Sequence, residues 1–581
     1  MTKYARCLLA LFLLLSPSIF ARQAGHAAAV HPSPATTAPT LAAHPPGAVI
    51  ASAHALATEA GLEIIRRGGN AFDAAIAVSS TLSVVEPVSS GLGGGGFFLL
   101  HDARSGKDVF VDAREIAPAS AAPAFYLDAK GNLDRDKAEN GAASAGIPGL
   151  PAGLVHIAKK YGRLSLAQSL APAIRIAREG FPVYPRMADQ YAQRRNVMER
   201  YPSTRAVYMA DGDGLETGET LRQPDLAHTF ELLAREGADG FYRGEVAKRM
   251  LATVKSDGVS WTDADLSGYQ VKERAPIRFR YRDMEVVTAP PPSSGGVALA
   301  ETLKVLEGWD LAKLDEPHRI HIVVEAMRRA FRDRTLYLGD PDSVQVPVRR
   351  LTSDDYAAGL RAAILPDKAT PSDMLPGVPP PHEGDNTTHY SIMDRDGNIV
   401  AATQTVNLSF GSGLVVGGAG FLLNDEMDDF ALRPGTPNAF GVMGYDANAV
   451  APGRRPLSSM SPTFLFSKDR VAALGAKGGT RIITAVLLGI LGYEQGLDSA
   501  HVVAKTRYHH QYLPDTILQE PGTLSAPTAT ALMRMGYRIT PDTSILVLMH
   551  AVDWDRRTNT LHGGADPRNQ VGSAKVLLTT H

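Results

Sequence analysis

Residues 384–407 read GDNTTHYSIMDRDGNIVAATQTVN, and this stretch decides the fold around it. Its two halves roughly alternate polar and apolar side chains, which is typical of strands. Between them, DRDG at 394–397 is typical of a tight turn, because glycine accepts positive φ and aspartate bonds nearby backbone. The stretch therefore predicts a hairpin in which Thr405 lies close to Thr387. Two neighbouring threonines are also a common feature of sheets, because strands favour threonine.

The composition is that of an ordinary globular protein. The chain has 581 residues and a formal net charge of −2, with 44% hydrophobic and 21% charged residues. This balance is sufficient for a large core. No excess of basic residues suggests a nucleic-acid partner.

The N-terminus has the pattern of a signal peptide. Lys3 and Arg6 precede an apolar run from Cys7 to Phe20, and small residues follow. We expect a signal peptide over 1–29, cut between about 21 and 29, and a disordered Pro/Ala-rich leader over 30–46. The apolar run is shorter than the roughly twenty residues of a membrane span, although an uncleaved anchor remains the alternative. Periplasmic or secreted location is expected.

The cysteine count limits the chemistry of the mature chain. Cys7 is the only cysteine, and it lies inside the predicted signal peptide. The mature chain would therefore have neither a disulfide nor a catalytic thiol. His318, His321 and Glu325 could suggest a metal site, but their spacing fits no usual zinc pattern. Packing roles are favoured for them, and neither a metal nor a cofactor is expected.

Two further features are ambiguous when they are considered alone. The run SGLGGGGFF at 90–98 could approach a phosphate, but it lacks the spacing of the nucleotide-binding motifs, so close backbone packing is favoured. Arg114 follows a strand predicted within 108–118, and by itself it is typical of a surface ion pair.

Several motifs together resemble those of the γ-glutamyltransferases, also called glutathione hydrolases. The resemblance covers about residues 47–581. It rests on GGNAFDAA (68–75), the glycine run, REIAP (114–118), GIPGLPAGL (146–154), PPPSSGG (290–296), TTHYS (387–391), FLLNDEMDDF (421–430), RPLSSMSP (455–462) and GGTRI (478–482).

The resemblance implies an α+β fold made from a cleaved precursor. The fold would be the four-layer αββα sandwich of the N-terminal nucleophile hydrolases, formed jointly by both subunits as a heterodimer. Self-cleavage would fall between Asn386 and Thr387, giving a large subunit over 47–386 and a small, catalytic subunit over 387–581. The Pro-rich segment 366–384 would be an exposed linker that gives the new C-terminus room to move.

The resemblance also assigns the catalytic residues. Thr387 would be the nucleophile and Thr405 would hold it in place. A threonine hydroxyl needs a base, and the freed α-amine has a pKa of about 7.7–8, near working pH. No G-x-S-x-G elbow indicates a serine hydrolase. The backbone N–H groups of Gly478 and Gly479 would stabilise tetrahedral negative charge.

The implied substrate pocket divides by charge. Cationic and hydroxyl donors would bind the donor's α-carboxylate: Arg114, Ser458 and Ser459. An amide and two carboxylates would bind its α-amine: Asn407, Glu426 and Asp429. A guanidinium suits a carboxylate because it can donate two parallel hydrogen bonds.

The chain departs from common family residues near the implied site. Lys477 stands where bacterial members commonly have Pro, and Thr480 where they have Ser. Asp425 replaces the second Asn of the LLNN motif, and Phe440, in the lid-like segment 433–449, aligns with a Tyr. Glu426 is Glu in some members and Gln in others, which would affect acceptor use. None of these departures removes a required group.

The expected substrates are glutathione and related γ-glutamyl amides, with water, an amino acid or a dipeptide as the acceptor. No nucleic acid and no stable membrane span are expected. One alternative is an acylase of the same fold that cleaves glutaryl or cephalosporin-type amides. The other is an uncleaved, inactive binding protein.

Overall fold

The computed structural model describes residues 41–209, 214–375, 386–432, 446–541 and 547–579. The predicted signal peptide and the proposed lid residue Phe440 lie outside these ranges. Within them, no helix combines the length and the apolar character needed to cross a membrane.

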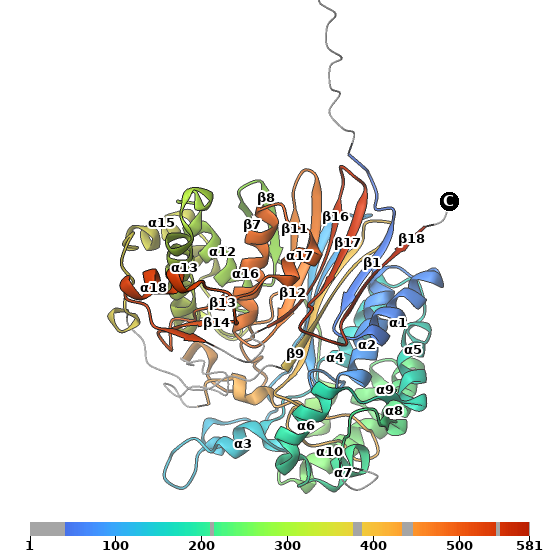
Figure 1. The fold of residues 1–581 in the computed structure, drawn as a ribbon. Helices are drawn as coiled ribbons and strands as arrows, with labels where there is room; N and C mark the ends of the chain where they lie inside the picture. The colour runs from blue at the N-terminus through green and yellow to red at the C-terminus, as the bar shows by residue number, and fades with distance from the viewer. Residues whose placement is uncertain (1–40, 210–213, 376–385, 433–445, 542–546, 580–581) are drawn as a thin grey trace, which may run out of the picture. The chain divides into compact units, whose positions relative to one another are not determined.

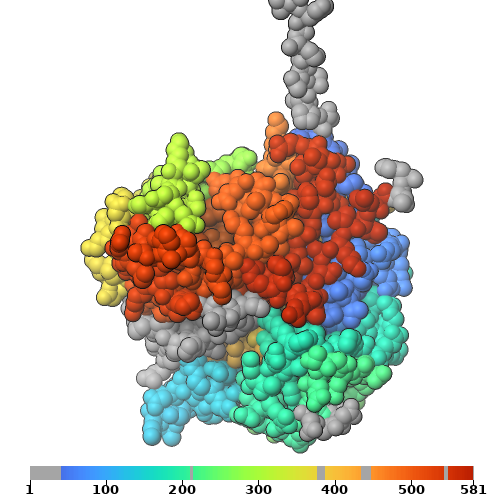
Figure 2. Space-filling view, viewed as in Figure 1, coloured from blue at the N-terminus to red at the C-terminus, as the bar shows by residue number. Residues whose placement is uncertain are grey.

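The predicted hairpin forms the centre of an antiparallel sheet. Among the described residues this sheet has seven strands. In spatial order they are β18 (Ser573–Leu578), β1 (Gly47–Ser52), β9 (Asn386–Met393), β10 (Ile399–Asn407), β2 (Gly95–Asp102), β3 (Lys107–Ala113) and β6 (Lys272–Arg274). The hairpin is flanked by β1 and β2, and the C-terminal strand β18 pairs with β1. Figure 2 accordingly shows blue and red segments side by side.

A second antiparallel sheet packs face to face against the first. Its described strands are, in order, β17 (Thr560–Ala565), β16 (Leu548–Asp555), β12 (Arg470–Lys477), β11 (Thr463–Phe466), β8 (Met284–Thr288) and β7 (Ile277–Tyr281). Strands β12 and β16 lie against β9 across the interface. Apolar side chains of both sheets share one core there, including Val49, Phe97 and Leu474.

Helices cover the outer face of each sheet (Figure 1). The first sheet is covered by α1 (Ala55–Arg66), α2 (Ala71–Val85) and α4 (Leu150–Tyr161), with α5 (Leu166–Glu179) and α8 (Pro224–Glu236) packed behind them. The second is covered by α12 (Gly295–Leu306), α16 (Arg481–Glu494) and α17 (Ser499–Ala504), with α13 (Glu316–Tyr337) packed on α12. The predicted αββα sandwich is confirmed.

Further elements complete the described fold. The remaining α-helices are α3 (Arg135–Glu139), α6 (Pro185–Met198), α7 (Pro202–Tyr208), α9 (Asp239–Tyr242), α10 (Gly244–Ser256), α11 (Asp263–Ser267), α14 (Val348–Leu351), α15 (Asp354–Ala362) and α18 (Ala526–Arg534). The remaining strands are β4 (Phe181–Pro182), β5 (Thr220–Leu221), β13 (Tyr508–His509), β14 (Ile517–Gln519) and β15 (Ile539–Pro541).

The chemistry of the hairpin turn is the one its sequence predicts. Asp394 Oδ1 accepts hydrogen bonds from the backbone N–H groups of Asp396 (2.9 Å) and Asn398 (3.0 Å), and Gly397 has φ = +88°. The resulting register places Thr405 directly opposite Thr387. Because side chains alternate along a strand, Thr387 shares a face with Met393, which packs in the core between the sheets. The nucleophile candidate therefore points toward the second sheet.

The glycine run next to this hairpin is used for close packing. An added Cβ at Gly94 would lie 2.0 Å from the carbonyl oxygen of Thr405, and one at Gly93 would lie 1.9 Å from that of Leu422. The favoured interpretation of the run is confirmed. Only glycine lets β2 and the segment before it approach the strand that carries Thr405 so closely.

Three boundaries differ from the sequence-based expectation. The helix expected over 52–66 begins at Ala55, because Ser52 pairs in β1 with both β9 and β18. The leader expected to be disordered to residue 46 has a placed contact, since Ala42 N donates to Arg556 O at 2.8 Å. In the described part of the expected linker, Ser372 is fully buried and donates to Tyr512 O at 2.5 Å, so exposure there is incomplete.

A substitution in the glycine run tests the close approach. Gly94→Ala should lower the free energy of unfolding by about 1–3 kcal/mol, because the added methyl group must displace the backbone of β10. Gly91→Ala is the matched control: its nearest contact would be Val406 Cγ1 at 3.7 Å, and a change within about 0.5 kcal/mol is expected. Equal losses in urea unfolding would contradict this account.

Candidate active site

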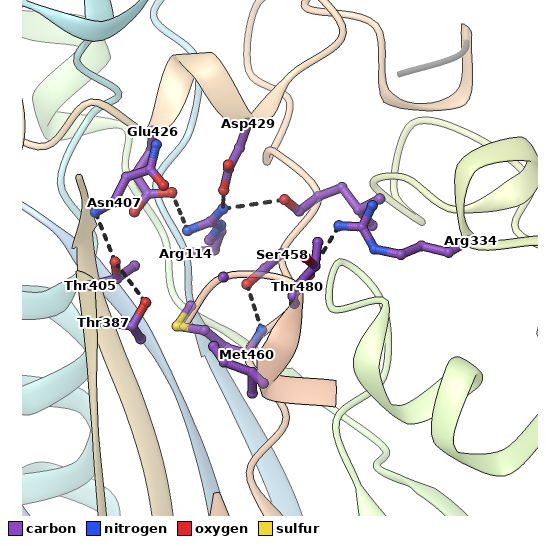
Figure 3. Close-up of a pocket in the computed structure, with 14 residues that line it drawn as sticks. Arg114, Arg334, Thr387, Thr405, Asn407, Glu426, Asp429, Ser458, Met460 and Thr480 are labelled. Carbon is purple, nitrogen blue, oxygen red and sulfur yellow. Dashed lines mark hydrogen bonds and ion pairs between the residues drawn. The ribbon is translucent and has the colours of Figure 1, made fainter. Parts of the chain in front are cut away.

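Thr387 lies at the start of β9, in a short chain of hydrogen bonds with its neighbours (Figure 3). Its Oγ1 donates to Thr405 Oγ1 at 3.5 Å, and Thr405 Oγ1 donates to the carbonyl oxygen of Asn386 at 3.0 Å. The backbone N–H of Asn407 donates to the same Thr405 oxygen at 2.8 Å. Thr405 thus contacts both the candidate nucleophile and the carbonyl group that precedes it.

A bulge in β10 places Asn407 beside this pair. The register shifts between Thr405 and Asn407, and Asn407 has φ = +78°, which is uncommon for a residue other than glycine. Asn407 Nδ2 donates to Asp425 O at 3.1 Å. Bulges re-aim side chains, and this one directs Asn407 into the cavity that Thr387 lines.

Arg114 occupies the centre of the same cavity, buried to 1% exposure. Its Nη1 lies 2.5 Å from Glu426 Oε2, and its Nη2 lies 2.6 Å from Asp429 Oδ2. Its Nε donates to Pro456 O at 3.2 Å, which fixes the plane of the guanidinium. The surface ion pair suggested by Arg114 alone is wrong, because the residue is enclosed by the loops that follow β3 and precede β11.

Four carboxyl groups lie in or beside the cavity, around Arg114. Glu115, Asp425, Glu426 and Asp429 all interact electrostatically with one another or with Arg114. Burial raises the pKa of Glu115 to about 7, against the opposing effect of Arg114. Burial and the neighbouring carboxyl groups also raise the pKa of Glu426 well above its ordinary range. A bound cationic group at this end of the cavity would therefore favour the charged form of these carboxyl groups.

The opposite end of the cavity presents hydroxyl groups. Ser458 and Ser459 line it from the loop before β11. Ser458 Oγ accepts from Met460 N at 3.1 Å, and Ser459 Oγ accepts from Arg334 Nη2 at 3.0 Å. With their oxygens engaged by donors, both hydroxyl protons are available to donate.

Gly478 and Gly479 form the turn between β12 and α16. Their φ values are +131° and +57°, in the region that glycine reaches without strain. Gly479 lines the cavity, whereas Gly478 is adjacent in sequence and is not among the lining residues. Backbone N–H groups just before a helix suit developing negative charge.

Nine of the ten predicted catalytic and substrate-binding residues thus line one cavity; Gly478 adjoins it. The departures Lys477 and Thr480 lie close by. Lys477 is buried, 3.6 Å from Glu86 Oε1, and Thr480 Oγ1 donates to Gln511 Oε1 at 2.5 Å. No group of three or more His, Cys, Asp or Glu side chains within the described ranges could hold a metal ion. His321 is packed against Tyr537, but His318 is half exposed and pairs with Asp315.

Sequence reasoning missed two residues that contact this machinery. Gln190, on α6, donates from Nε2 to Asn386 Oδ1 at 2.9 Å. Arg334, near the end of α13, lines the cavity and donates to Ser459. Neither belongs to a motif that names a role, because each reaches the site only through the packing of a distant helix.

Comparisons with known proteins agree with this geometry. The family described as gamma-glutamyltranspeptidase matches residues 57–576. The glutathione hydrolase proenzyme of Pseudomonas sp. (strain A14) is 41% identical over 541 residues, 91% of this chain and 94% of the relative. That of Escherichia coli (strain K12) is 39% identical, with 90% of each chain covered. The solved structure of cephalosporin acylase from Bacillus halodurans has a TM-score of 0.80 at 28% identity, covering 95% of this chain and 99% of that one.

The sandwich, with a threonine at the start of a central strand, defines an N-terminal nucleophile hydrolase. Within that class, the chain belongs to the γ-glutamyltranspeptidase family. The resemblance found in the sequence is confirmed, and the chain is an enzyme of this family.

Glu426→Gln tests the raised pKa of Glu426. The pKa of Glu426 is higher in the folded than in the unfolded chain, so folding takes up a proton between those two values and stability falls as pH rises through that range. The variant cannot titrate there. Urea unfolding should show it gaining stability relative to the wild type as pH rises above the ordinary glutamate pKa of about 4.3. A difference that is constant, or that shrinks as pH rises, would contradict the raised pKa.

Proposed function

We propose that the protein is a self-processing γ-glutamyltransferase and glutathione hydrolase in which Thr387 is the nucleophile. The observation that supports this best is the contact of Thr405 Oγ1 with both Thr387 Oγ1 and Asn386 O. One hydroxyl then serves two related acyl transfers. The first matures the chain, and the second is the catalytic reaction.

In maturation, Thr387 Oγ1 attacks the carbonyl carbon of Asn386. Thr405 Oγ1, which already donates to that carbonyl oxygen, stabilises the negative charge that develops on it. The C–N bond breaks, the nitrogen takes up a proton, and the peptide becomes an ester on Thr387. Water hydrolyses the ester, which leaves a carboxylate on Asn386 and a free α-amine on Thr387.

In the mature enzyme, that α-amine acts as the base for its own hydroxyl. The nearby histidine is engaged elsewhere, since His389 Nδ1 contacts Thr403 Oγ1 (2.8 Å) and Nε2 contacts Ser391 Oγ (3.0 Å). The activated hydroxyl attacks the γ-amide carbonyl of the donor, and the N–H groups of Gly478 and Gly479 would stabilise the negative charge on its oxygen. The amine leaves, and a γ-glutamyl ester remains on Thr387.

The ester is then released to an acceptor. Water gives glutamate, and the amine of an amino acid or dipeptide gives a new γ-glutamyl amide. The donor is recognised as a zwitterion, because its α-carboxylate matches Arg114 and the two serine hydroxyls. Its α-ammonium matches the carboxyl groups of Glu426 and Asp429, which line the cavity beside Arg114. Asn407 would complete the ammonium site as a neutral acceptor.

Export is part of the proposal. The N-terminal pattern of charge, apolar run and small residues supports a cleaved signal peptide and a periplasmic or secreted enzyme. The large subunit would then end at Asn386 and the small subunit would begin at Thr387.

Self-cleavage provides the first test. Thr405→Val should slow it by about a hundredfold, because one donor to the developing oxyanion is lost. The time course of the full-length band on a denaturing gel measures this. Thr403→Val, on the same face of β10 but in contact with His389, is the matched control and should cleave at the wild-type rate. Thr387→Ala should stay a single chain.

Two outcomes would contradict this maturation scheme. N-terminal sequencing of the smaller fragment should read TTHYS, and any other start would exclude cleavage at Asn386–Thr387. Wild-type protein that remained one full-length band would favour the uncleaved binding protein instead.

Substrate preference separates the enzyme from the acylase alternative. A glutaryl amide lacks the ammonium, so binding it would forgo the contact of that group with Glu426 and Asp429. Sites built around a polar group reject analogues lacking it by up to about 10⁴–10⁵. We expect kcat/KM to favour γ-glutamyl-p-nitroanilide over the glutaryl analogue by at least about a hundredfold. Asp429→Asn should shrink this gap by harming the γ-glutamyl substrate. Comparable efficiencies in the wild type would indicate an acylase.

A further inference from the structure

Arg334 is a second buried arginine in the wall of the active-site cavity. It lies near the end of α13 with 4% exposure, and it enters from the side opposite Asn407 (Figure 3). Its partners among the described residues are two hydroxyl oxygens: Nε donates to Ser294 Oγ at 2.8 Å and Nη2 donates to Ser459 Oγ at 3.0 Å. The ion pairs within 4.0 Å of the described chain do not include it, in contrast to Arg114.

Placing a guanidinium there has a cost. Burial disfavours its charge and lowers the pKa of Arg334 to about 10, although Asp429 acts in the opposite direction from farther away. The group is still cationic at neutral pH. Burying a charge without an adjacent counter-ion destabilises a fold, so two neutral hydroxyl partners do not explain its presence by themselves. An anion that enters the cavity would complete the balance.

The hydrogen bonds of Arg334 also determine what the serines can do. A guanidinium has only donors, so it occupies an acceptor position of Ser459 Oγ and turns the hydroxyl proton away from itself. Ser294 continues the chain: its Oγ and its N–H donate to Ser458 O at 2.8 Å and 2.7 Å. Arg334 therefore fixes both the orientation of the Ser459 hydroxyl and the backbone of the Ser458–Ser459 loop.

We propose that Arg334 is a positioning residue for the α-carboxylate of the donor. It acts through Ser459 and Ser294, keeps the serine hydroxyls aimed as donors into the cavity, and adds positive charge at the carboxylate end. This inference rests on the proposed function. The site would then have two arginines with different roles. Arg114 contacts the carboxylate, and Arg334 orients the serine hydroxyl groups that bind the same carboxylate.

The test compares two substrates that differ only in the carboxylate. γ-Glutamyl-p-nitroanilide carries it, and 4-aminobutyryl-p-nitroanilide lacks it while keeping the amine. Arg334→Gln should lower kcat/KM for the first by about ten- to a hundredfold, mainly through KM, and for the second by less than about threefold. The ratio of the two efficiencies should therefore collapse. Equal losses on both substrates would show a merely structural role and overturn the proposal.

Coupling and control variants sharpen the test. Ser459→Ala should remove most of the effect of Arg334→Gln, because the two changes disrupt one contact. Arg329→Gln is the matched control: Arg329 is buried on the same helix but pairs with Glu325 outside the cavity. It should leave the substrate ratio at the wild-type value even if it lowers stability. Strict additivity with Ser459→Ala, or the same collapse in Arg329→Gln, would contradict the proposal.

If Arg334→Gln does not fold or mature, a milder variant tests the same role. Ser294→Ala removes one of the two acceptors and should shift the substrate ratio in the same direction, by a smaller factor. An unchanged ratio there would count against the role of Arg334. Wild-type protein that releases no p-nitroaniline from the γ-glutamyl substrate would instead overturn the proposed function, and this inference with it. The two failures are thus distinguishable.

Discussion

The antiparallel pairing of β9 with β10 is the constraint on which the active site depends. It sets Thr405 opposite Thr387 and brings its hydroxyl to the carbonyl oxygen of Asn386. A register shift of one residue between the two strands would place the two threonines on opposite faces of the sheet and remove this contact. The turn at Asp394 fixes the register of β9 and β10 at one end of the hairpin. The close approach of Gly94 to Thr405 fixes the position of β2 beside β10. The surrounding sandwich holds that pairing in place from both faces.

Charge is the second organising feature, and it is arranged at some expense of stability. Arg114 is enclosed with Glu426 and Asp429, and further carboxyl groups nearby raise the pKa of Glu426. At the serine end of the cavity, Arg334 is a buried positive charge whose hydrogen-bond partners among the described residues are neutral hydroxyl groups. A zwitterion satisfies both ends at once, whereas a simple anion or cation satisfies one. Active sites commonly retain such unbalanced charges, although they lower stability, because these charges favour binding of the substrate.

Much of this was accessible from the sequence. The turn residues and strand alternation predict the hairpin, and nine of the ten residues that the motifs name line one cavity. The rest depends on tertiary packing. Ser52 lies in a strand because pairing with β9 and β18 prevails over a helical pattern. The burial of Arg114 and the charge imbalance follow from loops that converge only in the fold. Arg334 and Gln190 reach the site from helices whose local sequence carries no sign of it.

The central claim is that the hydroxyl of Thr387 carries the γ-glutamyl group after cleavage of the Asn386–Thr387 bond has freed the α-amine of the same residue. The most direct measurement is rapid acid quenching during turnover of a γ-glutamyl donor, followed by mass spectrometry of the N-terminal peptide of the small subunit. The account predicts that this peptide begins at Thr387 and gains the mass of one γ-glutamyl group as an ester on that residue. The same group on another residue, or turnover by a chain that still contains the intact Asn386–Thr387 bond, would contradict it.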